Sequence, residues 1–151
     1  MADHPIKARI VEAMKDAMRA RAKDRLSAIR LILAEFKKVE VDERIDVDDT
    51  RAISLLDKMV KQRRESIRQY TDGGRAELAA VEQAEIDIIQ EFLPAALSDD
   101  EISTLIDNAV QSTGASSMKD MGAVMNVIRP ELTGRADMGK VSQLVKQKLG
   151  A

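Results

Sequence analysis

Apolar residues recur every three or four positions through almost the whole chain, and this spacing most limits how the chain can fold. The first segment shows it clearly, with Ile6, Ile10, Met14 and Met18 each four residues apart. Residues at that spacing lie on one face of an α-helix, whereas a half-buried strand would need strict alternation. Strong helix formers dominate the composition and only three residues are proline. Together these features predict an all-α protein.

Caps and helix breakers divide the first part of the chain into four predicted helices. We expect them to begin at about Pro5 and Asp24 and to cover about residues 50–70 and 75–92. An acidic loop is predicted at residues 41–49, and paired glycines suit the end of the third helix. Asp48 and Asp49 are interpreted as helix-start residues that match the helix dipole.

The helical pattern is then interrupted at residues 93–98. Leu93 precedes Pro94 and is biased away from helical angles, and Ser98 with Glu101 has the S-x-x-E spacing of a capping box. Three helices are predicted beyond it, at residues 98–114, 117–132 and 138–149. We therefore expect an N-terminal four-helix domain at residues 1–93 and a C-terminal three-helix domain at residues 98–151, joined by a short proline-containing hinge.

The joint between the last two helices has its own chemistry. Pro130 lies late in one helix, Gly134 suits a left-handed C-cap, and Asp137 suits the N-cap of the next helix. Arg135 lies between these residues and has no part in capping. We expect its side chain to project outward.

Composition and motifs limit the possible chemistry and location. The chain has no cysteine, which removes disulfides and thiolate chemistry, and its aromatic content of 2% disfavours base stacking. The net charge of −2 argues against indiscriminate binding to nucleic acid, but a local basic patch would still attract it. His4 is the single histidine and is expected at an exposed end. No apolar run nears the ~20 residues of a membrane span, and no signal-peptide core precedes the first helix. We expect a soluble cytoplasmic protein without catalytic residues, cofactor or metal.

A basic stripe on the predicted third helix has two interpretations. Lys61, Arg64 and Arg68 share one side of that helix, and the following helix is strongly acidic. The stripe would either face the acidic helix across an antiparallel pair or form a phosphate-facing ridge. Arg63 falls on the apolar face instead, so it needs an interface, an acidic partner or a route to solvent.

The predicted sixth helix combines a polar face with a row of methionines. Lys119, Gly122, Asn126 and Arg129 share the polar face. A glycine within a helix costs about 1 kcal/mol relative to alanine, so we expect either a tightly packed neighbouring helix or an approaching RNA backbone or partner at Gly122. Methionines 118, 121 and 125 would be core residues or a docking surface for a partner helix.

Residues 121–149, including the joint at residues 133–137, resemble the C-terminal signature of the YqeY family. They are also similar to the tail domain of the B subunit of the tRNA-dependent amidotransferase. Residues 22–37, 61–70 and 91–102 resemble other YqeY segments in the same order. The resemblance implies an all-helical fold and a role beside tRNA, and members carry the label of a carbon–nitrogen ligase with glutamine as amide donor.

The resemblance implies a non-catalytic tRNA-binding accessory module, and its partner would be an amidotransferase or an aminoacyl-tRNA synthetase. The candidate phosphate contacts are Lys119, Gly122, Arg129, Arg135, Lys140, Lys146 and Lys148, with Lys61, Arg64 and Arg68 as a secondary ridge. The alternative function is a protein-interaction adaptor with no RNA role. Exposed methionines at positions 118, 121 and 125 would favour the adaptor.

Overall fold

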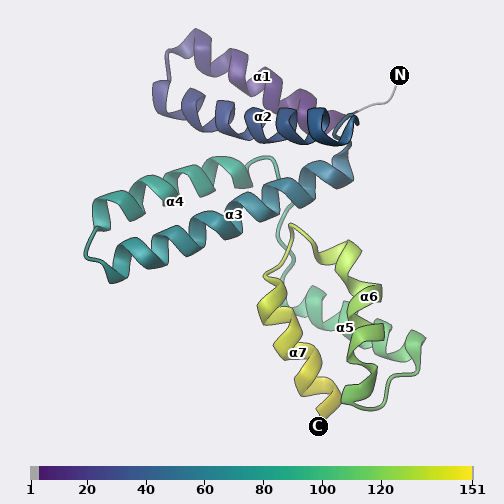
Figure 1. Cartoon of the computed structure of the whole chain (residues 1–151). Helices are drawn as coiled ribbons and strands as arrows, with labels where there is room; N and C mark the ends of the chain where they lie inside the picture. The colour runs from purple at the N-terminus through teal and green to yellow at the C-terminus, as the bar shows by residue number, and fades with distance from the viewer. Residues whose placement is uncertain (1–3, 151) are drawn as a thin grey trace. The chain divides into compact units, whose positions relative to one another are not determined.

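The computed structural model describes residues 4–150, which contain seven α-helices, one short 3-10 helix and no strand (Figure 1). The elements are α1 Pro5–Ala20, α2 Lys23–Glu43, α3 Asp49–Asp72, α4 Ala76–Gln90, α5 Asp99–Thr113, η1 Met118–Asp120, α6 Met121–Leu132 and α7 Met138–Gly150. The prediction of an all-α protein is confirmed. Within these residues, no helix combines the length and the apolar character needed to cross a membrane.

The described chain divides into two compact units, with the division between Leu93 and Pro94. Each unit has its own cluster of buried apolar side chains, and the two clusters share no residue. We call them the N-terminal unit and the C-terminal unit.

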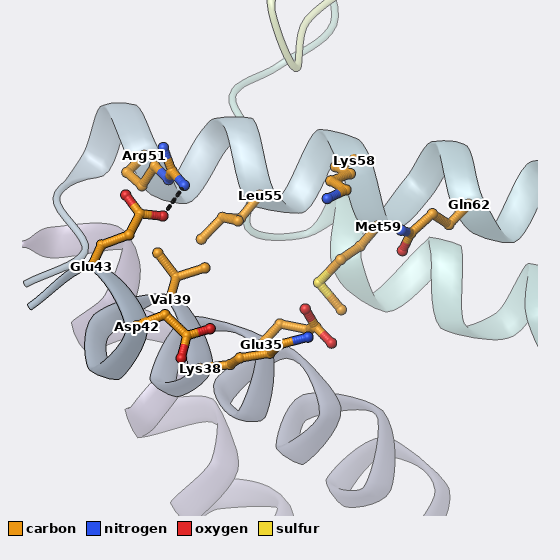
Figure 2. Close-up of a pocket in the computed structure, with 10 residues that line it drawn as sticks. All are labelled: Glu35, Lys38, Val39, Asp42, Glu43, Arg51, Leu55, Lys58, Met59 and Gln62. Atoms are coloured by element: carbon orange, nitrogen blue, oxygen red, sulfur yellow. Dashed lines mark hydrogen bonds and ion pairs between the residues drawn. The ribbon is translucent and has the colours of Figure 1, made fainter. Parts of the chain in front are cut away.

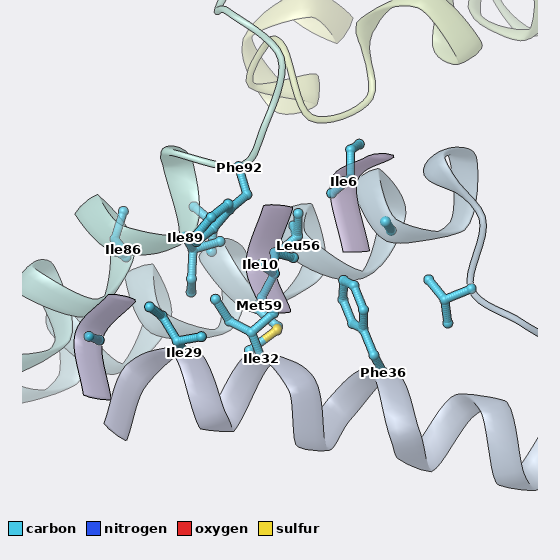
Figure 3. Close-up of a cluster of buried hydrophobic side chains, with 14 residues drawn as sticks. Ile6, Ile10, Ile29, Ile32, Phe36, Leu56, Met59, Ile86, Ile89 and Phe92 are labelled. Atoms are coloured by element: carbon cyan, nitrogen blue, oxygen red, sulfur yellow. The ribbon is translucent and has the colours of Figure 1, made fainter. Parts of the chain in front are cut away.

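The N-terminal unit consists of two helical hairpins, α1 with α2 and α3 with α4 (Figure 1). Its core is formed by side chains from all four helices, including Ile10, Ile32, Phe36, Leu56 and Ile89, which are at most 1% exposed (Figure 3). Burial of large aliphatic side chains contributes about 1.5–3 kcal/mol each to folding. The periodic stripes of the sequence supply this core.

The end of the N-terminal unit is fastened back onto its first two helices. Arg9 donates to the Glu91 carbonyl at 3.0 Å, and Arg25 pairs with the Glu91 carboxylate at 2.6 Å. The Phe92 side chain is only 4% exposed, and the Arg9 Cζ atom lies over its ring, 5.9 Å from the ring centroid. The segment that follows α4 therefore completes the same core to which α1 belongs.

Several helix boundaries differ from those expected. The helix α2 begins at Lys23, with Ala22 rather than Asp24 at the N-cap, and continues to Glu43, so the first three residues of the predicted acidic loop, 41–43, are helical. Residues 118–120 form a separate 3-10 turn before α6 instead of its first α-helical turn. His4 was expected at an exposed end, but both of its ring nitrogens are buried.

In the C-terminal unit, α5, α6 and α7 each contact the other two helices. Its core includes Ile106, Val124, Ile128, Leu132 and Val145, which are at most 1% exposed. The predicted capping box is present at the start of α5, where Ser98 and Glu101 exchange side-chain and backbone hydrogen bonds. Gly114 ends α5 with a φ of 68°, a conformation that glycine adopts without steric cost.

Candidate nucleic-acid interface

The α6–α7 joint is built from short-range hydrogen bonds. Gly134 has a φ of 77°, and the Asp137 carboxylate accepts from the Gly139 N–H at 3.0 Å, as an N-cap side chain does. The Thr133 hydroxyl donates to the Arg129 carbonyl at 2.8 Å, near the end of α6. These bonds satisfy backbone groups that a helix end leaves without partners. The joint thus holds α6 and α7 in a fixed local geometry.

Arg135 has a structural role that the sequence did not predict. Its Nε donates to the Ala95 carbonyl at 3.1 Å, and its own carbonyl accepts from the Leu97 N–H at 2.9 Å. The side chain is half-buried rather than projecting freely, because it ties the joint to the segment that enters α5. The guanidinium Nε is engaged in this bond, which fixes the orientation of the whole planar group.

Gly122 lies on an open face of α6. A Cβ atom added at Gly122 would meet no described atom within 4 Å, so the alternative of a tightly packed neighbouring helix is wrong. Asn126 and Arg129 are exposed on the same face, and Arg129 donates to the Asn126 side chain at 3.4 Å. Lys119 is exposed in the turn before α6. This face is therefore open at Gly122, polar and flanked by cations.

The three candidate lysines of α7 do not have the same surroundings. Lys140 and Lys146 are exposed. Lys148 instead donates to the Ser103 hydroxyl at 2.8 Å and pairs with the Asp107 carboxylate, so its ammonium fastens α7 to α5. Lys148 therefore differs from the other candidates, because a phosphate would have to compete with an existing carboxylate partner.

The basic stripe of α3 pairs along its own helix. Lys61 pairs with Asp57 at 3.0 Å and Arg68 with Glu65 at 2.6 Å, while Arg64 is exposed. Of the two interpretations of this stripe, pairing with the acidic α4 is not supported, because no ion pair joins Lys61, Arg64 or Arg68 to α4 within residues 4–150. Arg63 makes the cross-helix contact instead, because it lies on the face of α3 that packs against α4.

The methionines have mixed environments. Met125 is 7% exposed and belongs to the core, Met121 packs partly against it, and Met118 is 45% exposed. Val127, also on α6, is 47% exposed. The row of methionines is therefore neither entirely core nor entirely surface.

Two further features of residues 4–150 bear on small ligands. No group of three or more His, Cys, Asp or Glu side chains within these residues could hold a metal ion. A groove of about 230 Å³ lies between α2 and α3 (Figure 2). The Arg51–Glu43 ion pair at 2.5 Å lies at one end of the groove, and Val39, Leu55 and Met59 supply its apolar lining (Figure 2).

Comparison with known proteins identifies the family. The sequence model of the YqeY family, described as Yqey-like protein, matches residues 7–149. The chain belongs to the YqeY family. The match extends through both units of this YqeY protein, so the family covers the α6–α7 joint as well as the four N-terminal helices.

Relatives of this YqeY protein come from several fungi. A protein of Pyrenophora tritici-repentis, named altered inheritance of mitochondria protein 41, mitochondrial, is 29% identical over 147 residues, covering 95% of this chain and 80% of that protein. The protein of the same name from Clavispora lusitaniae is 32% identical over 123 residues, covering 79% and 71% of the two chains. An uncharacterized protein of Schizosaccharomyces pombe is 28% identical over 89 residues, covering 59% and 72%.

These names correct one expectation. A cytoplasmic location was expected from the sequence, but similar proteins from three fungi are named as mitochondrial proteins. The cytoplasmic expectation is therefore contradicted. The expectation rested on composition and on the character of the first residues, which do not by themselves determine where a protein is located.

Proposed function

We propose that this YqeY protein is a non-catalytic tRNA-binding accessory module, whose C-terminal unit contacts the RNA backbone. The observation that carries the proposal is the open face at Gly122, where a helix-destabilising residue has no packing explanation within the fold. A glycine at such a point lets a backbone approach closely. The cations at both ends of this face supply the charge that phosphates require.

The charge state of the candidate residues supports the same proposal. Lys119, Arg129, Lys140 and Lys146 take part in none of the ion pairs formed within residues 4–150. They can bind phosphate without first giving up an acidic partner. Arg135 is a further candidate, because its guanidinium is held in place through the Nε hydrogen bond to Ala95. Lys148 is not, because its ammonium joins α7 to α5.

The proposal includes a domain arrangement and a class of partner. The two units act as domains at residues 1–93 and 98–151, and the segment between them, which contains Pro94, serves as the hinge. The resemblance to the amidotransferase tail supports an amidotransferase or an aminoacyl-tRNA synthetase as partner. Any glutamine-dependent ligase activity belongs to such a complex.

The test is binding of the full chain to total tRNA at several salt concentrations, with an unstructured RNA of equal length as the control. Selective binding that weakens with salt is expected. The triple variant K119A/R129A/K140A should reduce the slope of log K against log salt by about three, roughly one for each lost phosphate contact.

A matched variant distinguishes the loss of specific phosphate contacts from a general loss of positive charge. K15A/K23A/K58A removes the same charge from exposed positions of the N-terminal unit, and its slope should stay close to that of the unchanged protein. Equal effects of both triple variants, or the absence of selective binding, would rule out the proposed interface.

A protein-interaction adaptor is the second candidate, and the exposure of Met118 and Val127 favours it. Flexible methionine side chains adapt to varied partner surfaces. In this case M118K/V127K should abolish capture of a partner from an extract, whereas K119A/R129A/K140A should leave capture unchanged.

A further inference from the structure

The helix α2 buries one apolar face in the fold and exposes two large apolar side chains on the other side. Ile29, Ile32 and Phe36 point from α2 into the core of the N-terminal unit and are fully buried (Figure 3). On the opposite face, Leu31 is 46% exposed and Val41 is 62% exposed. An amphipathic surface helix normally has one apolar stripe, and its other side is polar. Leu31 and Val41 are therefore available to a partner outside the unit.

Over residues 31–41 the outer stripe has heptad spacing, as in a short segment of coiled coil. Leu31, Ala34, Lys38 and Val41 follow one another at steps of three, four and three, and all four are exposed. These steps place Leu31 and Lys38 at heptad position a, and Ala34 and Val41 at position d. A single lysine at position a is known to fix register and the number of strands at some cost in stability.

Charged residues flank this stripe in an ordered way. The g positions hold Arg30 and Lys37, and the e positions hold Glu35 and Asp42. All four are exposed, and none of them forms an ion pair within the part of the chain that the structure describes. Figure 2 shows Glu35 and Asp42 along the edge of α2, beside Lys38.

This charge pattern selects one occupant and one orientation. In a parallel pair of helices, each g residue faces the e residue five positions further along the partner. Arg30 would then face Glu35 of a second copy, and Lys37 would face Asp42 of a second copy, so every flanking contact joins opposite charges. In an antiparallel pair, g faces g and e faces e, which sets like charges against each other.

We propose that the outer face of α2 pairs in parallel with the same face of a second copy, as a short two-stranded coiled coil. The pairing requires no rearrangement, because the core-facing residues of α2 stay in place. It is a two-fold interface, in which the same surface serves both chains. This inference is independent of the proposed RNA contacts, which lie in the other unit.

The first experiment is sedimentation equilibrium of the full chain over a wide range of concentration. The unchanged protein should show a monomer–dimer equilibrium, and L31E/V41E should raise the dimer dissociation constant about tenfold or more, because acidic groups replace the apolar seam. Both positions are exposed in the monomer, so the circular dichroism and unfolding midpoint of the variant should match those of the unchanged chain. A monomer at every concentration, or unchanged association in the variant, would overturn the proposal.

A charge exchange tests the flanking contacts. R30E/K37E makes both flanks acidic and E35K/D42K makes both basic, so each variant alone should dimerise about tenfold or more weakly. Mixing the two variants should restore association as a heterodimer, since each flank then meets the opposite charge. Failure of the mixture to associate would contradict the assigned g and e positions.

The orientation has a direct readout because the chain contains no cysteine. In the parallel pair, Ala34 lies next to Ala34 of the second copy, within the Cα separation of about 4.4–6.8 Å that a disulfide requires. A34C should cross-link rapidly under mild oxidation. The control Q83C, also exposed but on α4, should cross-link slowly. Equal rates for the two variants would exclude the parallel pairing.

Discussion

At the scale of single residues, Arg63 shows how a charge is accommodated between two packed helices. Its Nε donates to Glu85 of α4 at 2.8 Å, and the two side chains are 14% and 24% exposed. The guanidinium also donates to the Met59 carbonyl at 3.3 Å. The sequence predicted that Arg63, on the apolar face of its helix, needs an interface, an acidic partner or a route to solvent. The structure shows an acidic partner on the neighbouring helix.

We predict that R63A lowers the free energy of unfolding by about 1–3 kcal/mol, because Glu85 would keep a half-buried charge without its partner. The double variant R63M/E85M should recover most of that loss, since apolar side chains of similar length can fill the same space. Urea unfolding of the three proteins measures both effects. Equal destabilisation by the single and double variants would contradict this account.

Glu40 makes the stability of the N-terminal unit depend on pH. The Lys7 ammonium, which donates to Glu40 at 2.7 Å, lowers the pKa of that carboxyl below its ordinary value of 4.5, although burial opposes the shift. The Val47 N–H also donates to the carboxylate at 3.2 Å. A carboxyl with a lowered folded-state pKa stabilises the fold above its unfolded pKa, and this contribution is lost as the pH falls through the folded value.

We therefore predict that E40Q weakens the decline of stability on the acid side of pH 4.5. The variant should be less stable than the unchanged protein at neutral pH, and the two should converge as the pH falls. Urea unfolding across a pH series tests this, with E131Q as a control that removes a charge from an exposed position. Parallel curves for E40Q and the unchanged protein would refute the assignment.

Residue roles that depend on local chemistry could be predicted, and long-range ones could not. The Ser98–Glu101 capping box and the helix start at Asp48 follow from spacings of three residues. Lys148 and Ser103 are 45 residues apart, and Arg135 and Ala95 are 40 apart. A spacing pattern carries no information about such partners, because they depend on how the helices pack.

At the scale of elements, two glycines in the C-terminal unit have opposite effects on helix stability. Gly122 lies inside α6 with open space around it, whereas Gly134 has a φ of 77° just beyond the end of that helix. The sequence indicated both sites, but it could not distinguish packing from exposure at Gly122. The positions of the helices were predicted well because they follow from local spacing. The ends of the helices were predicted less well.

We predict that G122A raises the free energy of unfolding by about 0.5–1 kcal/mol, because alanine is the better helix former and meets no neighbour. G134A should lower it by about 1–2 kcal/mol, since a Cβ disfavours the left-handed conformation. Thermal unfolding of G122A and G134A compares the same glycine-to-alanine change at two positions. Under the proposed function, G122A should also weaken tRNA binding. At low temperature, the tRNA binding of G134A should be reduced only in proportion to the fraction of the protein that is unfolded.

At the scale of the whole molecule, the two separate cores imply that damage to one unit need not spread to the other. Ile106 belongs to the C-terminal core and Leu56 to the N-terminal core, and both are fully buried. We predict that I106A destabilises the C-terminal unit by about 2–5 kcal/mol and leaves the other unit almost unchanged, with the reverse for L56A. Hydrogen exchange followed by mass spectrometry assigns the lost protection to each unit.

The position of Phe92 also governs how the protein is made. Its side chain completes the cluster to which Ile6 and Ile10 of α1 belong. The hairpin of α1 and α2 is synthesised before α3, α4 and Phe92, which supply the rest of this core, so its apolar face is not fully covered until Phe92 has followed. Translation at about 5–20 residues per second puts roughly 2–10 seconds between the end of α2 and that point. During this interval the nascent chain presents an incompletely covered apolar surface, and it is then that a chaperone would bind it.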